Sequence, residues 1–435
     1  MVVFPRSRLF LGLVLVGATA FATACGAGSD VPGASDKPVD CDFPPQKRTT
    51  VNVLAYNSSA IDPFANAMVN SCSKNGVTVK RAPVDFSGQY QKTATTLAGN
   101  QGTYDIIEMY SGAVPGYAAT GKLLPLDDLL AKYAKKYQLD DIDPAMLKGL
   151  SHDGKLYALP MQANVGTMIY RKDIFAKAGL EPPTTYAELL AAARKIKKAG
   201  LAKHPVALPF SDSTSTLFEQ TMSSQGKTYV NPENKAPTFD TPEAAKGVKA
   251  LKDLVPYMDP DVFAFNQPRV QQQMVTGKAA VTIMFSGRMA DMIDPKQSAF
   301  AKKFAFAAPP SIAPGGKAGS LVSVDGWSIP ANSRVDPDLL FRIMAASTGR
   351  ETSEQAMPAA YPARQGVTTA GNPPYAAAVE DALARGAANP PMATWLGNMQ
   401  NATSPLLQRA VSGRTPVQTA LTRCQKAGAA VLADD

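Results

Sequence analysis

A regular alternation of strand and helix patterns over residues 50–110 constrains the fold of this chain more than any other feature. The segment TVNVLAY at 50–56 alternates apolar residues with period two, which is typical of a strand. Asp62-Pro63 predicts a helix start, with Asp62 as the cap, and Asn75-Gly76 predicts its end. Strands are expected at 77–80 and 103–110, with a further helix between them. This order implies an α/β fold with a parallel sheet covered by helices.

The rest of the chain continues the same pattern and is long enough for a second lobe. Thr185 and Glu188 form a predicted capping box at the start of a helix that Gly200 ends. A buried strand is expected at 279–285, and the breaker-rich segment 309–318 is a predicted connector. About 410 residues follow the leader described next, which exceeds what one core usually supports, so two lobes are expected.

The first 25 residues have the pattern of an export leader. Two arginines precede an apolar run from Leu9 to Ala22, which is too short for a comfortable membrane span of about 20 apolar residues. Ala22-Thr23-Ala24-Cys25-Gly26 resembles a bacterial lipobox, so residues 1–24 are a predicted signal peptide and Cys25 a predicted lipidation site. Residues 25–46 are then a lipid-anchored flexible stalk, and the protein works outside the cytoplasm. The alternative is a plain secreted protein that is cut nearby.

Charge and cysteine content narrow the function further. The formal net charge of +8 becomes +6 when the leader removes two arginines, and the basic residues are scattered, so nucleic-acid binding has little support. Three cysteines remain after the lipobox, at Cys41, Cys72 and Cys424. A Cys41–Cys72 disulfide is favoured, and the alternative leaves Cys72 and Cys424 as buried thiols.

Residues for catalysis or metal binding are scarce. His152 and His204 are the only histidines and lie far from any cysteine in the sequence, so no metal site and no cofactor is expected. Gly226-Lys227-Thr228 resembles the end of a phosphate loop, but Thr221 stands where its first glycine belongs. Glu108 and Asp325, both at predicted strand ends, leave open a carboxylate pair for glycoside hydrolysis.

Several segments resemble one family, the extracellular solute-binding proteins of ABC importers, in the sugar-binding group that includes maltose-binding protein. The block GKLYALPMQANVGTMIYRKDIFAKAGLEPPTTYAELLAAARKI at 154–196 is the most similar. The other similar segments are YDIIEMYSGAVPGYAATGKLLPLDDLL at 104–130, TGKAAVTIMFSGR at 276–288, 317–348, and YPARQG at 361–366. Their order and spacing cover essentially the whole chain after the leader, and residues 289–310 look most like members that carry polyols and small sugars.

The resemblance implies a non-enzymatic clamshell of two α/β lobes with the ligand between them. The chain would cross the hinge three times, near 162–165, 311–317 and 349–357. Residues 47–163 with 317–350 would build lobe 1, and residues 166–310 with 355–435 would build lobe 2. A monomer is expected, with the permease of an ABC importer as its partner.

Candidate ligand-binding residues come from two sources. Open α/β sheets place their sites just after the carboxyl ends of strands, which selects Tyr56, Asn57, Ser58, Tyr110, Ser111, Asp325 and Trp327. The family resemblance adds Gln162, Asn164, Phe210, Arg288, Arg364 and Trp395. Aromatic rings would cover the apolar face of a sugar, and polar side chains would satisfy its hydroxyls.

Arg288 departs from the family pattern, because a stacking tryptophan is common there. A guanidinium also suits a carboxylate or phosphate, so an anionic ligand such as a glycerophosphodiester or sugar acid is the alternative to a neutral sugar. Two other classes stay open: an envelope glycosidase or lyase, and a receptor or adhesion lipoprotein on the same scaffold.

Overall fold

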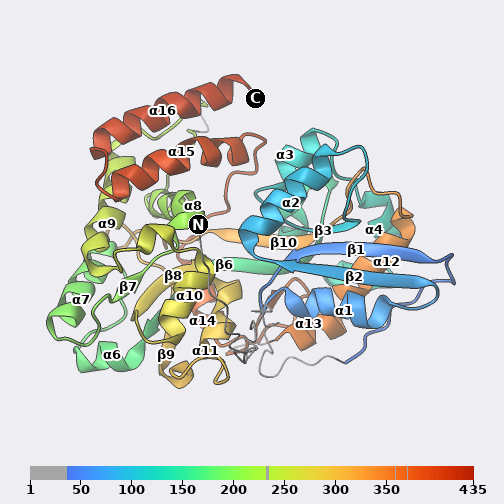
Figure 1. Cartoon of the computed structure of the whole chain (residues 1–435), viewed down its shortest axis with the longest axis horizontal. Coiled ribbons are helices and arrows are strands. Elements are labelled where there is room, and N and C mark those ends of the chain that lie inside the picture. Colours follow the sequence, from blue (N-terminus) through green and yellow to red (C-terminus); the bar gives the residue numbers. More distant parts are fainter. Residues whose placement is uncertain (1–36, 232–234, 358, 370) are drawn as a thin grey trace, which may run out of the picture.

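One long strand, β6 (Leu159–Arg171), runs through both halves of the molecule (Figure 1). Its first half pairs with β10 and β11, and its second half pairs with β8 and β9. The structure is a computed structural model that describes residues 37–435 except 232–234, 358 and 370. The two-lobed α/β fold expected from the sequence is confirmed, with β6 as the element common to both lobes.

The first lobe is built on the strand order β2-β1-β3-β10, continued by the first half of β6. β1 pairs in parallel with β2 and β3, whereas β10 runs antiparallel to β3 and β6. Helices α1, α12 and α13 pack together, and α2 packs on β1. The strands are β1 (Thr49–Tyr56), β2 (Val77–Val84), β3 (Ile106–Tyr110), β10 (Val322–Ser328) and β11 (Tyr361–Pro362), with the hairpin β4 (Ser151–His152) and β5 (Lys155–Leu156). The helices are α1 (Asp62–Cys72), α2 (Phe86–Ala98), α3 (Val114–Ala119), α4 (Asp127–Tyr133), η1 (Leu139–Asp141), α5 (Pro144–Gly149), α12 (Pro337–Ser347) and α13 (Arg350–Ala356).

The second lobe surrounds the other half of β6, in the order β6-β8-β7, with β9 also paired to β6. Helices α8, α9, α15 and α16 pack against one another on one side of it (Figure 1). Its strands are β7 (Val206–Ala207), β8 (Val281–Phe285) and β9 (Phe304–Ala307). Its helices are α6 (Lys172–Lys177), α7 (Tyr186–Lys198), α8 (Phe210–Ser223), α9 (Pro242–Leu254), η2 (Val255–Tyr257), η3 (Val262–Ala264), α10 (Gln267–Val275), η4 (Ser286–Arg288), α11 (Met289–Ile293), η5 (Ala301–Lys303), α14 (Ala376–Ala384), α15 (Leu396–Val411) and α16 (Val417–Ala433).

Helix starts and stops follow local chemistry. The predicted capping box of α7 is present, with Thr185 Oγ1 accepting from the Glu188 amide and the Glu188 carboxylate accepting from the Thr185 amide. Asp62 is not the cap of α1, as the sequence suggested. Ile61 takes the cap position, and Asp62 is the first helical residue. The Asp62 carboxylate pairs with the Arg81 guanidinium instead of capping the helix.

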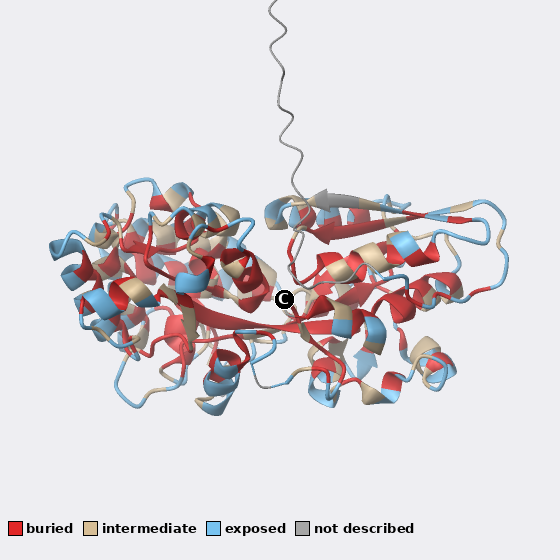
Figure 2. Ribbon diagram, turned by 90° about the horizontal axis from the view of Figure 1, so that it is seen from below, coloured by how far each residue is buried: buried red, intermediate tan, exposed pale blue. Residues whose placement is uncertain are grey.

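Burial follows the strands. Figure 2 shows buried residues running along the sheet through both lobes, with exposed residues on the outer faces of the helices. β6 illustrates this pattern, since twelve of its thirteen residues are buried. A strand that is covered on both faces does not alternate between buried and exposed residues, and in LPMQANVGTMIYR the polar residues Gln162, Asn164 and Thr167 are buried along with the apolar ones.

The chain passes between the two halves of the molecule at three places. β6 makes the first crossing, at Gly166, whose amide donates to the Leu321 carbonyl in the segment that makes the second crossing. Residues 350–364 pack against the first lobe, because α13 contacts α1 and Arg364 binds Asp141. α14 already packs on β9 of the second lobe. The third crossing therefore follows Arg364, later than the expected 349–357.

Residues 37–46 are attached to the first lobe. Cys41 and Cys72 are joined by a disulfide, and Cys424 is a buried free thiol. Val39, Cys41 and Phe43 are buried, so the expectation of a flexible stalk up to residue 46 is wrong for this stretch. The disulfide and the burial of Phe43 hold it on the core. The predicted signal peptide 1–24, Cys25 and the stalk up to residue 36 lie outside the described residues. Within the described residues, no helix is long and apolar enough to cross a membrane.

Candidate ligand-binding cleft

A cavity of about 140 Å³ lies between the two lobes and is lined by both. Its first-lobe walls come from the ends of β1, β3 and β10, and its second-lobe walls come from α8, η4 and α15. We call it the inner cavity. It is the deep end of an open groove of about 940 Å³, with which it shares Phe86, Tyr110, Asp212, Ser215 and Gln400. This is where a doubly wound sheet is expected to hold a ligand, outside the carboxyl ends of its strands.

Three aromatic rings form one wall of the inner cavity. Tyr56 ends β1, Tyr110 ends β3, and Phe86 begins α2 directly after β2. Phe86 makes an edge contact with Tyr56 at 5.7 Å between ring centroids and a tilted contact with Tyr110 at 5.8 Å. No sequence pattern singles out Phe86, because the strand predicted there ends at residue 80, whereas β2 continues to Val84. The wall offers the flat apolar surface that a sugar ring or polyol chain needs.

Two buried carboxyl groups, Glu108 and Asp325, lie on neighbouring strands behind this wall. Asp325 pairs with Tyr110 in the β3–β10 register, so Glu108, two residues earlier, is its diagonal neighbour. Gln89 Nε2 donates to Glu108 Oε2 at 2.6 Å, and Gln162 Nε2 donates to Asp325 Oδ2 at 2.9 Å. Burial, reinforced by the charge of Asp325, raises the pKa of Glu108 well above its usual value. Burial raises the pKa of Asp325 to about 7, against the opposing hydrogen bonds from Gln162 and Asn164.

Asn164 connects this pair to the second lobe. Its side-chain amide donates to Asp325 Oδ2 at 3.4 Å, and its Oδ1 accepts from the backbone amide of Gly287 at 2.9 Å. Asn164 lies on β6 just before the first crossing. The Asn164 side chain therefore links the Gly287 backbone, in the turn after β8, to the Asp325 carboxyl on β10.

The second lobe contributes a guanidinium that makes no hydrogen bond within the described residues. Arg288, in the turn after β8, is 7% exposed, and no hydrogen bond from its side chain is present within the described residues. Its guanidinium carbon lies 5.7 Å from the centroid of the Tyr56 ring. Arg288 lines the inner cavity and also a second cavity of about 550 Å³, which contains Asn57 and Ser58. A buried guanidinium whose N–H groups have no acceptor within the described residues is available for a ligand oxygen.

Glu219 on α8 is the second unpaired group. It lines the inner cavity, is 3% exposed, and has no hydrogen-bond partner within the described residues. Burial raises its pKa to about 8. No sequence signal singled it out, because the segment around it was not assigned to a helix and its neighbours in the sequence form no recognisable motif.

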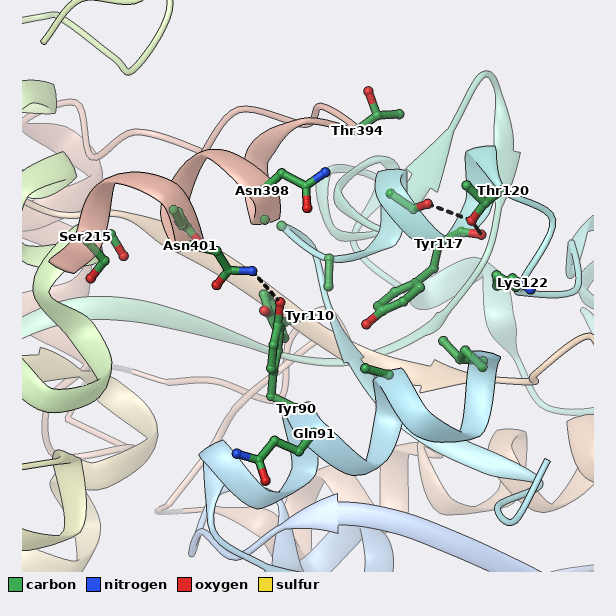
Figure 3. A pocket seen from close by; sticks show the side chains of 18 of the residues that line it. Tyr90, Gln91, Tyr110, Tyr117, Thr120, Lys122, Ser215, Thr394, Asn398 and Asn401 are labelled. Atoms are coloured by element: carbon green, nitrogen blue, oxygen red, sulfur yellow. Dashed lines mark hydrogen bonds between the residues drawn. The ribbon is translucent and has the colours of Figure 1, made fainter. Parts of the chain in front are cut away.

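The mouth of the groove is also built from both lobes. Figure 3 shows Tyr90, on α2, pointing toward Asn401, on α15, and the Asn401 amide donates to the Tyr90 hydroxyl at 3.4 Å. In Figure 3, Tyr110 lies behind this bond and Ser215 lies to its left, and Tyr117 and Asn398 also line the groove. The groove thus leads from solvent to the inner cavity between α2 and α15.

Of the residues predicted from the sequence, those brought together around the inner cavity are Tyr56, Tyr110, Asn164, Arg288 and Asp325. Asn57 and Ser58 line the adjacent cavity instead. Ser111 and Gln162 are buried just outside: Ser111 Oγ accepts from the Val324 amide, and Gln162 holds Asp325. These two residues act on the cavity through their neighbours.

The remaining predicted residues, Phe210, Trp327, Arg364 and Trp395, do not line any of these cavities. Phe210 is buried and stacks on Phe263 at 5.0 Å. Trp327 is fully buried: in a regular strand it would share a face with Asp325, two residues earlier, but the bulge between Asp325 and Gly326 lies between them. Trp395 is half-buried against the core.

Arg364 forms an ion pair with Asp141 within the first lobe. Its guanidinium binds the Asp141 carboxylate and the Gln138 carbonyl, and its Nε donates to the Thr348 carbonyl at 2.8 Å. The residue is 3% exposed. It joins η1 to the end of α12, which is a structural task.

The chemistry of the cleft is that of binding. Among the described residues, no cluster of three or more histidine, cysteine or acidic side chains is arranged to hold a metal ion. The carboxyl groups of Glu108 and Asp325 come from adjacent strands of one lobe and are held by amides. The arrangement offers rings, hydrogen-bond acceptors and one cation to a small polar molecule.

Comparisons with known proteins agree with this geometry. The profile of the bacterial extracellular solute-binding protein family matches residues 56–336, about two thirds of the chain. A mannitol-binding protein of Pseudomonas aeruginosa is 43% identical over 95 residues, which cover 21% of this chain and 20% of that protein. A probable amino-acid ABC transporter periplasmic-binding protein of Sinorhizobium fredii is 23% identical over 293 residues, covering 65% of this chain and 64% of that protein. The chain thus spans less than two thirds of the length of these relatives.

Solved structures share the whole fold. A solute-binding protein of Agrobacterium vitis with bound D-mannitol has a TM-score of 0.76 and 23% identity, covering 88% of this chain and 98% of that one. A solute-binding protein of Agrobacterium radiobacter in complex with ribitol has a TM-score of 0.75 and 21% identity, with the same coverage. Members of the matching family are binding components of transport systems and not enzymes. This chain belongs to the family of bacterial extracellular solute-binding proteins.

Proposed function

We propose that this protein captures a small sugar or polyol in the inner cavity and delivers it to the permease of an ABC importer. The observation that carries the proposal is the cavity itself, in which both lobes present rings and unpaired polar groups to one enclosed space. The wall formed by Tyr56, Phe86 and Tyr110 would cover the C–H face of the ligand, and Arg288, Glu219 and Asn164 would meet its hydroxyls. Relatives whose names or bound ligands are mannitol and ribitol support the same ligand class.

Ligand capture would work through the relative position of the lobes. The chain passes between them at Gly166, near Leu321, and again after Arg364. We take residues 47–163 with 317 to about 366 as lobe 1 and the remainder from residue 166 as lobe 2. A ligand that touches both lobes binds the closed form more tightly than the open one and shifts the population toward it. The closed lobes would then offer a joint surface to the permease.

Two features speak against an anionic ligand such as a glycerophosphodiester or sugar acid. Arg364 is bound by Asp141, so Arg288 is the single cation among the residues that line the inner cavity. Four carboxyl groups, those of Glu108, Asp212, Glu219 and Asp325, surround the same space. An anionic ligand would require these carboxyl groups to stay protonated, so its binding would weaken as the pH rises through their raised pKa values.

The anchor belongs to the same proposal. The lipobox at Ala22–Gly26 would attach the mature chain to the outer face of the membrane through an acylated Cys25, and the protein would act as a monomer. The chain from Cys25 to the buried Val39 would be the tether. Metabolic labelling with an alkyne fatty acid tests this point, since the wild-type chain should be labelled and Cys25→Ser should not.

The ligand is tested by a thermal-shift panel of mannitol, ribitol, sorbitol, tagatose, maltose and laminaribiose, with a glycerophosphodiester and a sugar acid as anionic probes. Each compound that raises the melting temperature is then titrated calorimetrically. A ligand at 100 times its Kd should add about 2.7 kcal/mol of stability. The double variant Arg288→Met with Glu219→Gln serves as the binding-deficient protein. It should keep the fold and lose the ligand-induced rise in melting temperature. Turnover of any compound, or a response only to glycerophosphodiesters and sugar acids, would contradict the proposal.

A further inference from the structure

Glu219 is a buried carboxyl that the protein itself does not satisfy. It lines the inner cavity at 3% exposure and has no hydrogen-bond partner in the described part of the chain. A carboxyl group that is removed from water without a partner is costly, and such groups in folded proteins call for an explanation. A ligand group placed in the cavity is the partner that its position allows.

The other three carboxyl groups of the inner cavity already have partners. Gln89 holds Glu108, and Gln162 and Asn164 hold Asp325. Asp212 accepts from the Gln267 backbone amide at 3.2 Å and from the Ser213 hydroxyl at 2.9 Å. Glu219 is therefore the one carboxyl group lining the inner cavity for which no hydrogen bond is present on either oxygen within the described residues.

Arg288 does not supply the missing charge. Its guanidinium opposes the rise in the pKa of Asp212 and of Asp291, which places it beside those two carboxyls. It exerts no such effect on Glu219, whose pKa is raised by burial alone. The cation and the free acid thus serve different parts of the cavity.

Among the residues that the structure describes, the other surroundings of Glu219 supply no counter-charge that acts on its pKa. Helices α9 and α15 pack against α8, but no charged group on them acts on its pKa. Tyr229, behind it, is a neutral phenol whose own pKa is raised by burial and then by the Glu219 charge. An ionised Glu219 would have to receive its positive partner from the ligand.

We propose that the inner cavity selects ligands that carry a protonated amine among their hydroxyl groups, such as amino sugars and amino polyols, and that Glu219 accepts the hydrogen bonds of this amine. The inference rests on the proposed function and specifies its substrate class. An ammonium group donates three hydrogen bonds, and charge-assisted bonds are about twice as strong as neutral ones. Arg288, on its separate side of the cavity, would donate to the hydroxyl oxygens of the same ligand.

Binding would release one proton. The free protein holds Glu219 as a neutral acid at pH 7, and the ligand arrives as R–NH3⁺. In the complex the acid is the carboxylate and the amine keeps its protons, so the acid proton passes to the solvent. A neutral sugar would bind with Glu219 protonated and release none.

The test compares pairs of probes that differ by the amine: glucosamine with glucose, 1-amino-1-deoxysorbitol with sorbitol, and the glucosamine disaccharide with cellobiose. N-acetylglucosamine keeps the nitrogen and removes the charge. Each is titrated calorimetrically at pH 7 in two buffers of different ionisation enthalpy. The amine of at least one pair should bind about tenfold more tightly than its neutral partner, with about one proton released.

The variant Glu219→Gln separates the charge from the shape of the side chain. It should bring the amine and its neutral partner to within about twofold of each other and abolish the proton release. Glu354→Gln, at an exposed position on α13, is the matched control and should leave both unchanged. Melting curves of all three proteins establish that they are folded.

The outcomes distinguish the inference from the proposed function. Binding of neutral sugars that equals or exceeds that of their amines, or an amine preference that survives Glu219→Gln, overturns the inference and leaves the sugar-binding function standing. If the protein binds a neutral polyol but none of the amine probes, the inference is likewise overturned and the sugar-binding function stands. If no sugar, polyol or amine binds at all, both proposals fall together.

Discussion

Ser58 donates a hydrogen bond from its Oγ to the carbonyl oxygen of Gly287 at 2.8 Å, and this bond joins the loop after β1 in the first lobe to the turn after β8 in the second. Ser58 is buried, and Gly287 lies in the buried turn η4. Gly287 also donates its amide to Asn164 on β6. The turn that contains Gly287 is thus held by two side chains: the Ser58 hydroxyl of the first lobe and the Asn164 amide near the crossing.

Replacing this hydroxyl should weaken ligand binding without unfolding the protein. Ser58→Ala removes one bond between the lobes, which is worth about 0.5–1.5 kcal/mol, so the closed form loses that much relative to the open one. We expect the Kd of the ligand to rise about two- to tenfold in calorimetric titration. Ser412→Ala, which removes a hydroxyl bond within the end of α15, is the control and should leave the Kd unchanged.

The aromatic wall should matter more than either tryptophan. Tyr110→Ala removes a ring that lines the inner cavity, and we expect at least a tenfold loss of ligand affinity, because a stacked ring contributes on the order of 1 kcal/mol beyond its area. Trp395→Phe alters a ring that does not line the cavity and should change the affinity less than twofold. An equal loss in the two variants would show that the wall has been misassigned.

Arg364 should behave as a structural residue. Asp141→Asn removes the carboxylate from a guanidinium that is almost fully buried, and breaking such a pair costs about 3–5 kcal/mol. Denaturant unfolding of the purified protein measures this loss. At a temperature where the variant remains folded, its ligand affinity should match that of the wild type, whereas a direct ligand contact by Arg364 would lower both.

Stability of the ligand-free protein should fall as the pH rises. Burial raises the pKa of Asp325 to about 7 and that of Glu219 to about 8, whereas both groups ionise near pH 4 in the unfolded chain. Between these values the folded state holds protons that the unfolded state has released, so the contribution of each group is complete below about pH 4 and declines toward pH 8. The decline is up to about 1.4 kcal/mol per pH unit for each group.

Melting temperatures measured from pH 5 to pH 8.5 check this trend. The lowered pKa values of Asp173 and Glu188 act in the opposite sense, but at pH values below their usual pKa near 4. Glu219→Gln should flatten part of the slope, and Glu354→Gln should not. A stability that rises between pH 6 and pH 8 would rule out protonated Asp325 and Glu219 in the free protein.

Reduction of the Cys41–Cys72 disulfide should destabilise the first lobe. The bond closes a loop of 31 residues, and the chain-entropy model assigns it about 3–4 kcal/mol. Unfolding in guanidinium chloride with and without a reductant measures the difference. The double variant Cys41→Ser with Cys72→Ser should resemble the reduced protein and show no further response to the reductant.

The repeating elements of the fold were predictable from the sequence alone. The buried stripe of α1, the capping box of α7 and the period-two pattern of β1 are local properties, because side-chain direction follows the backbone period within one element. The same locality explains why Tyr56, Tyr110 and Asp325 could be placed near the cleft, since each stands at the carboxyl end of its strand or on the strand beside it.

What only the tertiary structure decided is which buried group faces the ligand and which faces the core. Trp327 and Asp325 are two residues apart on one strand and both are buried, yet the bulge between Asp325 and Gly326 and the packing around them put only the carboxyl in the cavity. Arg364 and Arg288 are both buried arginines, and a distant aspartate pairs with one of them alone. Glu219 lines the inner cavity together with residues of the opposing lobe. These are contacts between residues far apart in the chain, so no local period or motif encodes them, and they exist only once the two lobes have been brought together.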